Sequence, residues 1–221
     1  MDHTEKICHI IGAADFASDR FEAARGDLVI ACDAGILSIE RIGVKPDIIL
    51  GDFDSLGYIP AGDNVDVHPV RKDDTDSQLA LELGLSRGFK RFILHGCTGG
   101  ERFDHTVANI QTLAYAAEHG GTATLFDERF TATVIKNARL DFSSRNGGDI
   151  SVFAYGGAAR GVYETGLSYS ASDVTLTPDR AMGASNSFIG QAASISVRDG
   201  RLLVIWSGGG RLPLPKIVLF E

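Results

Sequence analysis

The sequence predicts an α/β domain followed by an all-β domain. Residues 1–127 alternate short apolar runs with segments of helical composition, which is the pattern of a parallel sheet covered by helices. Residues 131–221 contain only short apolar runs separated by glycine-rich turns, which is the pattern of an antiparallel β-sandwich. With 221 residues, of which 44% are hydrophobic, the chain can bury a core in each domain.

Charge and composition disfavour several classes of function. The formal net charge is −8 and the basic residues form no cluster, so binding to nucleic acids or anionic membranes is disfavoured. No apolar run approaches the roughly 20 residues of a membrane helix. The first residues, MDHTEKICHIIGAAD, lack the basic stretch of a signal peptide, and three cysteines without a CxxC pair argue against a disulfide framework. We therefore expect a cytoplasmic protein that has neither nucleic-acid nor membrane partners.

In the first domain, predicted strands and helices alternate along the chain. Apolar runs bounded by turn residues predict strands at residues 6–13, 27–33, 47–50, 65–70, 91–97 and 122–126. Composition and apolar spacing predict helices at residues 16–25, 36–42 and 75–84, and from residue 104. These elements predict a Rossmann-like parallel sheet with helices on both faces, a fold that binds ligands at the carboxyl ends of its strands.

The segment KPDIILGDFDS at residues 45–55 reads as a buried strand that leads into two aspartates. If the backbone stays extended beyond the strand, Asp52 and Asp54 point one way and Phe53 points into the protein. Their Cα atoms would then lie about 6.6 Å apart, so both carboxylates could converge on a hard cation such as Mg²⁺. The alternative is a pair of solvated turn aspartates.

The segment RKDDTDSQLALELG at residues 71–84 predicts a helix with polar residues crowded at its start. Thr75 and Gln78 fit a capping box, in which two side chains satisfy backbone donors reciprocally. An acidic first turn complements the helix dipole, which explains Asp76 on its own. It does not explain why Lys72 and Asp73 lie beside Asp76, at the expected end of another strand. The apolar face of this helix comprises Leu79, Ala80, Leu83 and Gly84.

The loop after residues 91–97 has residues that suit a phosphate group. Gly99 and Gly100 let a backbone approach a phosphate closely, and the planar fork of Arg102 suits phosphate oxygens. Asp104 is expected to be the N-cap of the next helix, which is a sufficient reason for its presence, and His105 to be a helix-start residue. The core face of that helix is expected to comprise Val107, Ile110, Leu113, Ala114 and Ala117.

In the second domain, short apolar runs predict strands without helices. The expected strands lie at residues 131–135, 150–155, 174–176, 192–197, 202–206 and 217–220. The sequence RDGR at residues 198–201 predicts a hairpin turn between two of them. The two domains are expected to join near residues 127–131.

Five short motifs follow one another in a characteristic order. They are DxG at residues 33–35, PD and GDFDS at 46–55, KDxTD at 72–76, GGxRxDH at 99–105 and GxSNxF at 183–188. With this set the chain closely resembles thiamine pyrophosphokinase (thiamine diphosphokinase) over essentially its whole length. The family usually has two glycines after the first aspartate and a nearby Asn, whereas residues 33–37 here read DAGIL. Because of this departure, a polar contact that the family would make just after Asp33 is not expected here, whereas the role of Asp33 itself is unaffected.

The resemblance implies transfer of a pyrophosphoryl group from ATP to the hydroxyl of thiamine, giving thiamine diphosphate and AMP, with Mg²⁺ as the cofactor. It also implies a homodimer with shared active sites, each built from the α/β domain of one chain and the β domain of the other. Residues 1–127 would bind ATP and Mg²⁺, and residues 131–221 would bind thiamine and form the dimer.

The resemblance also implies roles for individual residues. The metal carboxylates would be Asp52, Asp54 and Asp76, which with Arg102 and Asp104 form the catalytic set. The nucleotide would be bound by Asp33, Lys72, Asp73, Thr75, Gly99 and Gly100. Ser185 and Asn186 would hold the pyrimidine of thiamine. Because thiamine is a flat cation, its pocket should also have an aromatic or apolar wall, for which Tyr169 and Trp206 are the candidates.

The residues alone leave two other functions open. Phosphoryl-type transfer needs positioning and charge neutralisation, which three aspartates and a nearby cation supply. A magnesium-dependent phosphohydrolase or nucleotidyltransferase could use the same aspartates. A non-catalytic protein that binds thiamine or a nucleotide is the other alternative.

Overall fold

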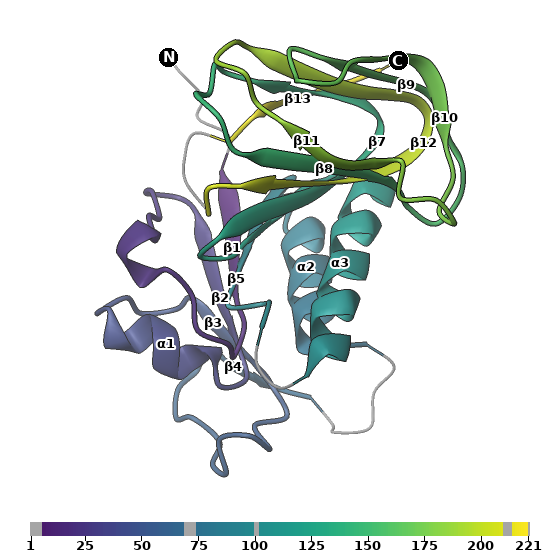
Figure 1. Cartoon of the computed structure of the whole chain (residues 1–221). Helices are drawn as coiled ribbons and strands as arrows, with labels where there is room; N and C mark the ends of the chain where they lie inside the picture. The colour runs from purple at the N-terminus through teal and green to yellow at the C-terminus, as the bar shows by residue number, and fades with distance from the viewer. Residues whose placement is uncertain (1–5, 69–73, 100–101, 210–213, 221) are drawn as a thin grey trace. The chain divides into compact units, whose positions relative to one another are not determined.

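A computed structural model of the chain describes residues 6–68, 74–99, 102–209 and 214–220 (Figure 1). The chain divides into two compact units, Met1–Glu128 and Arg129–Glu221. The prediction of a mixed α/β fold with few helices and many strands is confirmed. Among the described helices, none combines the length and the hydropathy needed to span a bilayer.

The strands of the first unit pair in parallel. Their spatial order is β6 (Thr122–Phe126), β5 (Arg91–His95), β1 (Ile7–Ile11), β2 (Leu28–Cys32), β3 (Ile48–Gly51) and β4 (Val65–Val67). Every residue of β2 and β3 is buried, as expected for parallel strands that are covered on both faces.

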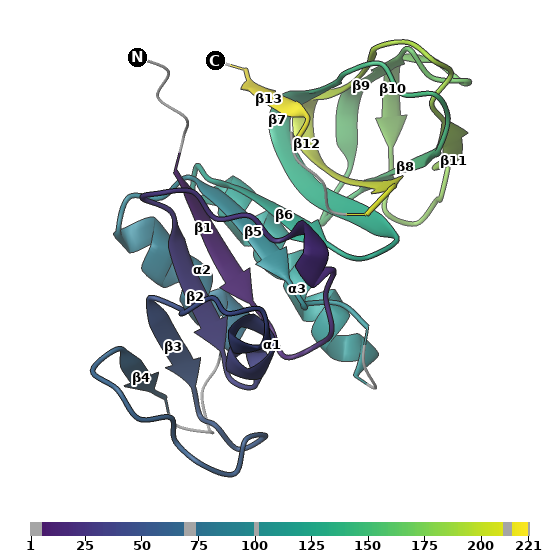
Figure 2. The same ribbon diagram turned by 90° about the vertical axis from the view of Figure 1, so that its left-hand side faces the viewer.

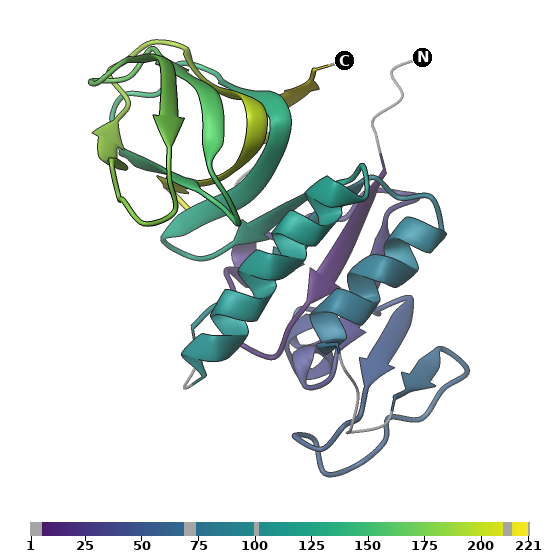
Figure 3. The ribbon, with the colours of Figure 1, turned by 90° about the vertical axis from the view of Figure 1, so that its right-hand side faces the viewer.

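The helices of this unit lie on both faces of the parallel strands. Helix α1 (Gly35–Arg41) covers one face, which is turned toward the viewer in Figure 2. Helices α2 (Asp76–Ser86) and α3 (Phe103–Glu118) cover the other face, seen in Figure 3. Gly84 lets α2 approach the sheet closely, since a Cβ there would lie 2.5 Å from Cε1 of Phe92.

The predicted helix at residues 16–25 is wrong. Only the short 3-10 turn η1 (Ser18–Arg20) forms there. The rings of Phe16 and Phe21 both pack on the His95 ring, with centroid distances of 5.5 and 5.2 Å. In an α-helix, residues five apart differ by about 140° in direction, so a helix could not direct both rings to one point.

Helix α2 begins as predicted. Oγ1 of Thr75 accepts a hydrogen bond from the backbone N–H of Gln78 (3.3 Å), so Thr75 is the N-cap. The Gln78 side chain donates from Nε2 to a carboxylate oxygen of Glu82, one turn further along the helix (2.9 Å). The buried face is shifted from the predicted one: it comprises Ser77, Ala80, Leu81 and Gly84.

Helix α3 starts two residues earlier than an N-cap at Asp104 predicts, so that prediction is wrong. The N-cap is Arg102, and Asp104 lies in the first turn. The predicted core face is also rotated, since Val107 is 42% exposed whereas Leu113 is fully buried. Two polar residues take the buried positions instead and are satisfied there. Asn109 donates to the backbone oxygen of Cys97 (2.8 Å), and Thr112 donates to that of Ala108 (3.2 Å).

A buried pair of histidines forms part of the core of the first unit. Nδ1 of His9 lies 3.2 Å from Nε2 of His95, and Nε2 of His9 lies 3.5 Å from a carboxylate oxygen of Asp27. The His95 ring also packs on Phe126, at a centroid distance of 5.5 Å. Burial lowers the pKa of His95 from 6.5 to about 3, with a smaller contribution from His9.

We expect this histidine to make the first unit sensitive to acid. In the unfolded chain His95 binds a proton below about pH 6.5, but in the folded chain it binds one only near pH 3. The free energy of unfolding should therefore fall below pH 6.5, by up to about 1.4 kcal/mol per pH unit from this group. Urea denaturation at several pH values measures the slope. His95→Leu should flatten it, whereas replacing the exposed His119 with Gln should not; equal slopes in wild type and His95→Leu would contradict the assignment.

The strands of the second unit pair antiparallel. They are β7 (Phe130–Phe142), β8 (Asp149–Ala154), β9 (Ala159–Thr165), β10 (Ala171–Leu176), β11 (Gly183–Ser187), β12 (Ala193–Ser207) and β13 (Lys216–Leu219). Strand β12 is central, because it pairs with β7, β8 and β9. The edge pairs are β9 with β10, β8 with β11 and β7 with β13. Strands β9 and β11 were not predicted.

The predicted hairpin at residues 198–201 is wrong. These residues form a bulge inside the continuous strand β12, where Val197 pairs with Ala138 and Arg201 pairs with Lys136. Four steps along β12 therefore match two steps along β7. Gly200 has a φ of 108° and its N–H donates to Oδ1 of Asn137 (3.0 Å), so the turn-forming residues bend the strand without reversing it.

Candidate functional site

Three aspartates converge at the carboxyl ends of β2 and β3. Asp33 follows β2, and Asp52 and Asp54 follow β3, which is the parallel neighbour of β2. One carboxylate oxygen from each of the three lies within 4.8 Å of the others. This separation suits a single hard cation, which prefers several carboxylate oxygens.

The convergence is produced by a tight turn, not by an extended backbone. Phe53 has a φ of 60°, so the prediction that the strand geometry continues through Asp54 is wrong. The backbone N–H of Asp54 donates to Oδ1 of Asp52 (3.2 Å), which closes the turn. Phe53 does point into the protein, as predicted: it is 2% exposed and belongs to the core cluster around Ile11 and Ile49.

Asp33 belongs to the same carboxylate cluster as Asp52 and Asp54. Its φ is 48°, and its backbone N–H donates to the oxygen of Leu50 (2.8 Å), which ties the ends of β2 and β3 together. Oδ2 accepts a hydrogen bond from the hydroxyl of Ser55. Oδ1 is buried and has no hydrogen-bond partner among the described residues. A buried anionic oxygen without a donor is costly, so this atom fits a site that receives a cation.

Four more predicted residues of the first unit line a cavity together with these aspartates. A cavity of about 530 Å³ is lined by Asp33, Asp52, Asp54, Thr75, Asp76, Gly99 and Arg102. Asp76 lines the cavity at the start of α2 but is not in the cluster of three carboxylates. Lys72, Asp73 and Gly100 lie outside the described residues.

Arg102 and Asp104 form an exposed ion pair beside the cavity. Nε of Arg102 lies 2.9 Å from Oδ1 of Asp104, and Nη2 lies 2.6 Å from Oδ2. The guanidinium lowers the pKa of the Asp104 carboxyl to about 2. The pair orients the planar fork of Arg102, which is the group that suits phosphate oxygens.

Several residues that line the cavity were not predicted. They are Gly12, Ala13, Ala14, Cys32, Ser55, Ser77, Gly96, Cys97, Thr98, His105, Thr106 and Asn109. Gly12 and Gly96 face one another so closely that a Cβ on Gly12 would lie 2.5 Å from the oxygen of Gly96. The available signal was that Gly12 ends the first apolar run of the chain, as Gly51 ends the third.

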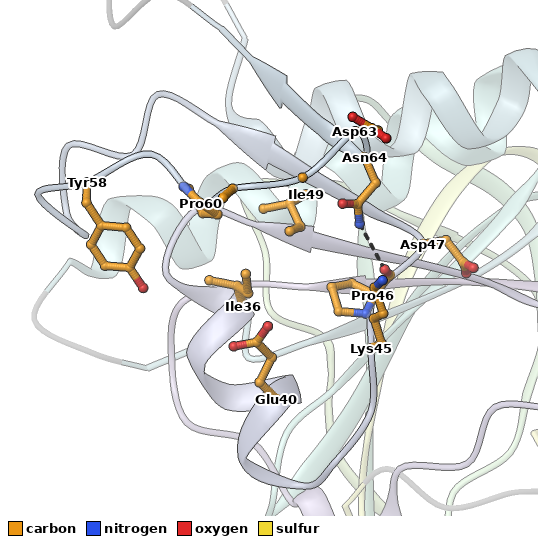
Figure 4. A pocket seen from close by; sticks show the side chains of 12 residues that line it. Ile36, Glu40, Lys45, Pro46, Asp47, Ile49, Tyr58, Pro60, Asp63 and Asn64 are labelled. Carbon is orange, nitrogen blue, oxygen red and sulfur yellow. Dashed lines mark hydrogen bonds between the residues drawn. The ribbon is translucent and has the colours of Figure 1, made fainter.

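A second cavity, of about 1010 Å³, lies between α1 and the loop that leads to β4 (Figure 4). Ile36 and Glu40 of α1 contribute one side, and Tyr58 and Pro60 contribute another. It shares no lining residue with the carboxylate cavity, and none of the predicted site residues lines it. The carboxylate cavity is therefore the candidate active site, although it is the smaller of the two.

The residues predicted for the thiamine end lie together in the second unit. Ser185 is exposed with a φ of 62°, and its N–H donates to the hydroxyl of Ser151 (3.1 Å). Asn186 is 5% exposed, and its Oδ1 accepts from the N–H of Tyr169 (3.0 Å). The ring of Tyr169 is on the surface, with 74% of the residue exposed. Trp206 is buried and packs on Phe142, with a centroid distance of 5.3 Å, which leaves Tyr169 as the exposed aromatic candidate.

We expect Gly51→Ala to disturb the carboxylate cluster. A Cβ on Gly51 would lie 3.1 Å from both Cα and N of Asp33, so Asp33 must move by a few tenths of an ångström. Because catalytic groups tolerate little misplacement, kcat should fall about tenfold. Gly157→Ala is the control, since no atom lies within 4 Å of its Cβ position. Full activity of Gly51→Ala with whichever substrate the protein turns over would show that this contact does not position Asp33.

Comparison with known proteins agrees with the site. The family described as "Thiamin pyrophosphokinase, catalytic domain" matches residues 22–125, which include all three clustered aspartates. The predicted resemblance to thiamine pyrophosphokinase is confirmed. The thiamine pyrophosphokinase of Bacillus subtilis (strain 168) is 27% identical over 187 residues, which cover 81% of this chain and 87% of the relative.

Solved structures of thiamine pyrophosphokinases have the same fold as this chain. The crystal structure from Bacillus subtilis has a TM-score of 0.79 and 24% identity, and covers 91% of this chain and 99% of its own. The structure from Geobacillus thermodenitrificans has a TM-score of 0.76 and 23% identity, over 92% and 98% of the two chains. The thiamine pyrophosphokinase of Candida albicans is only 14% identical, yet its TM-score is 0.70, over 92% and 89% of the chains.

Proposed function

We propose that this chain transfers a pyrophosphoryl group from ATP to the hydroxyl of thiamine, giving thiamine diphosphate and AMP. The observation that carries the proposal is the convergence of Asp33, Asp52 and Asp54 within 4.8 Å, inside the segment that matches the catalytic domain of thiamine pyrophosphokinases. The Rossmann-like character of the first unit and the sandwich character of the second are part of this proposal.

The residues of the candidate site suit this chemistry. Asp33, Asp52 and Asp54 would hold Mg²⁺, and Asp76 lines the same cavity close to the expected phosphates. Bound there, Mg²⁺ supplies positive charge that offsets the charge of the phosphate oxygens. Asp33 thus takes a metal role in this proposal, in place of the nucleotide role that the sequence suggested.

The other residues position the substrates. Arg102 would bind phosphate oxygens with a fork already oriented by Asp104. Thr75 and Gly99, which line the cavity, would contact the nucleotide. The sequence motifs assign Lys72, Asp73 and Gly100 to the nucleotide as well. Ser185 and Tyr169 would contact thiamine, and Asn186 lies beneath them.

The two units would have separate tasks. The α/β unit would bind ATP and Mg²⁺, and the β unit would bind thiamine and form a homodimer. Each active site would then combine the α/β unit of one chain with the β unit of its partner. Such an arrangement would explain why the residues proposed to bind thiamine and the residues proposed to bind Mg²⁺ belong to two different units of the chain.

Product analysis tests the proposed function. Purified protein is incubated with ATP, Mg²⁺ and thiamine, and the nucleotides are separated by chromatography. We expect AMP to form only when thiamine is present, in equal amount to thiamine diphosphate. Thiamine-independent release of AMP, ADP or phosphate would indicate a phosphohydrolase or nucleotidyltransferase. Binding of thiamine without any turnover would indicate the non-catalytic alternative.

A further inference from the structure

The side chain of Asn186 is fully used inside the second unit. Its Nδ2 donates to Oε2 of Glu164 (3.0 Å) and to the backbone oxygen of Tyr169 (2.7 Å). Its Oδ1 accepts from the backbone N–H groups of Tyr169 (3.0 Å) and Ser187 (2.9 Å). A primary amide has two donor hydrogens and two acceptor positions, so these four bonds saturate it. Asn186 therefore has no hydrogen-bonding capacity left for a bound molecule.

These bonds make Asn186 a clamp on Tyr169. Both the N–H and the C=O of Tyr169 are held by one amide, although the two residues are 17 positions apart in the chain. The Tyr169 ring stays on the surface with 74% of the residue exposed. Met182 and Ile189, just outside the two ends of β11, are 56% and 51% exposed. An exposed aromatic ring on a backbone that is held in place is suited to contact a bound molecule.

Glu164 supplies one of the four hydrogen bonds that fix the orientation of the Asn186 amide. Its carboxylate lies on β9 at 5% exposure and accepts from Nδ2 of Asn186, so the NH₂ group must face it. Rotation of the amide by half a turn would place its oxygen against the carboxylate and its NH₂ group against two backbone donors. Burial raises the pKa of Glu164, and the bond from Asn186 opposes this rise.

We propose that Glu164 is a positioning residue for the thiamine end of the reaction, acting through Asn186 to hold Tyr169 and the turn at Ser185 in place. This inference rests on the proposed function, since it assigns Tyr169 and Ser185 to the thiamine surface. Glu164 itself does not touch the substrate. Its contribution is to keep the backbone at Tyr169 and the backbone at Ser185, which are distant in the sequence, in fixed positions.

Four variants and a control test the inference. Glu164→Ala should raise the KM for thiamine about tenfold, the effect of losing one hydrogen bond to a charged group, and Asn186→Ala should raise it at least as much, because it removes all four bonds. The KM for ATP should change by less than about twofold, because ATP is assigned to the other unit. The KM for thiamine of the double variant should not exceed that of Asn186→Ala, because both substitutions break the same chain of hydrogen bonds. Glu164→Gln should recover most of the affinity, since its amide oxygen also accepts from Nδ2. The control is Thr165→Ala, an exposed neighbour on β9.

Amide hydrogen exchange provides a second measurement that does not depend on turnover. The N–H groups of Tyr169 and Ser187 should lose protection in Glu164→Ala and Asn186→Ala, but keep it in Glu164→Gln. An unchanged KM for thiamine in Glu164→Ala would overturn the inference. The inference would also be overturned if Glu164→Gln raised the KM for thiamine as much as Glu164→Ala does. An equal rise in the KM for thiamine and for ATP in Glu164→Ala would overturn it as well. If the wild-type protein does not convert thiamine, the proposed function fails instead, and the exchange result still reports on the clamp.

Discussion

Replacing Asp52 or Asp54 with Asn should lower kcat for thiamine-dependent AMP formation by at least about a hundredfold. Each substitution keeps the shape of the side chain but removes a negative charge that the bound cation requires. The size of the effect is that of losing one electrostatic stabiliser of the transition state. Both side chains lie with Asp33 in a cluster in which one carboxylate oxygen of each residue is within 4.8 Å of the others.

The fold should survive these substitutions, because neither carboxylate lies in the core. The thermal midpoint should change little, and the binding of Mn²⁺, followed by its magnetic resonance signal, should weaken in both variants. Asp63→Asn is the matched control, since Asp63 lies in the loop before β4 and lines the other cavity. If both variants keep near-normal activity while remaining folded, these aspartates do not hold the catalytic metal.

Mixing two inactive variants should restore activity. A chain with Ser185→Trp should have a blocked thiamine surface, and a chain with Asp52→Asn should have a defective metal site. If each active site combines two chains, a mixed dimer has one site with both changes and one site with neither. Random pairing makes half of the dimers mixed, so the mixture should reach roughly a quarter of wild-type activity.

The same experiment distinguishes a site built within one chain. In that case every site in the mixture carries one of the two changes, and the mixture stays inactive. Mass measurement of differently tagged chains confirms that mixed dimers have formed. Absence of recovery in a preparation with confirmed mixed dimers would refute the shared site.

Much of the first unit was predictable because its residues obey local rules. The runs that became β1, β2, β3, β5 and β6 are apolar, short and bounded by turn residues, which is what a covered parallel strand requires. Thr75 was recognisable as an N-cap because its hydroxyl acts on a backbone donor three residues away. The segment of Phe16 and Phe21 was wrongly predicted as a helix, because both rings pack on His95, which comes from β5, far along the chain.

In the second unit, the misreading of residues 198–201 has a similar cause. Arg198, Asp199 and Gly200 have the composition of a hairpin turn, and nothing in the local sequence distinguishes a turn from a bulge. The outcome is decided by pairing, because β7 runs alongside β12 on both sides of the bulge. The strand β11, with sequence GASNS, has no apolar run that could have indicated it.

The candidate site was predictable in its residue types and less so in its geometry. The sequence indicated Asp52 and Asp54 as a pair, but only the turn at Phe53 and the close contact between Gly51 and Asp33 bring the third carboxylate in. The role of Asp104 as a partner of Arg102 was hidden by its suitability as a cap. The clamp formed by Asn186 depends on Tyr169 and Glu164, which lie 17 and 22 positions before it in the chain, so local sequence rules could not predict it.

In the proposed reaction, the β and γ phosphates move together from ATP to thiamine. ATP that is radiolabelled at the β phosphorus tests this directly, because the label must travel with the transferred group. We predict that the label appears in thiamine diphosphate and that the AMP formed is unlabelled. Recovery of the label in ADP or in free phosphate, with the thiamine product unlabelled, would contradict pyrophosphoryl transfer.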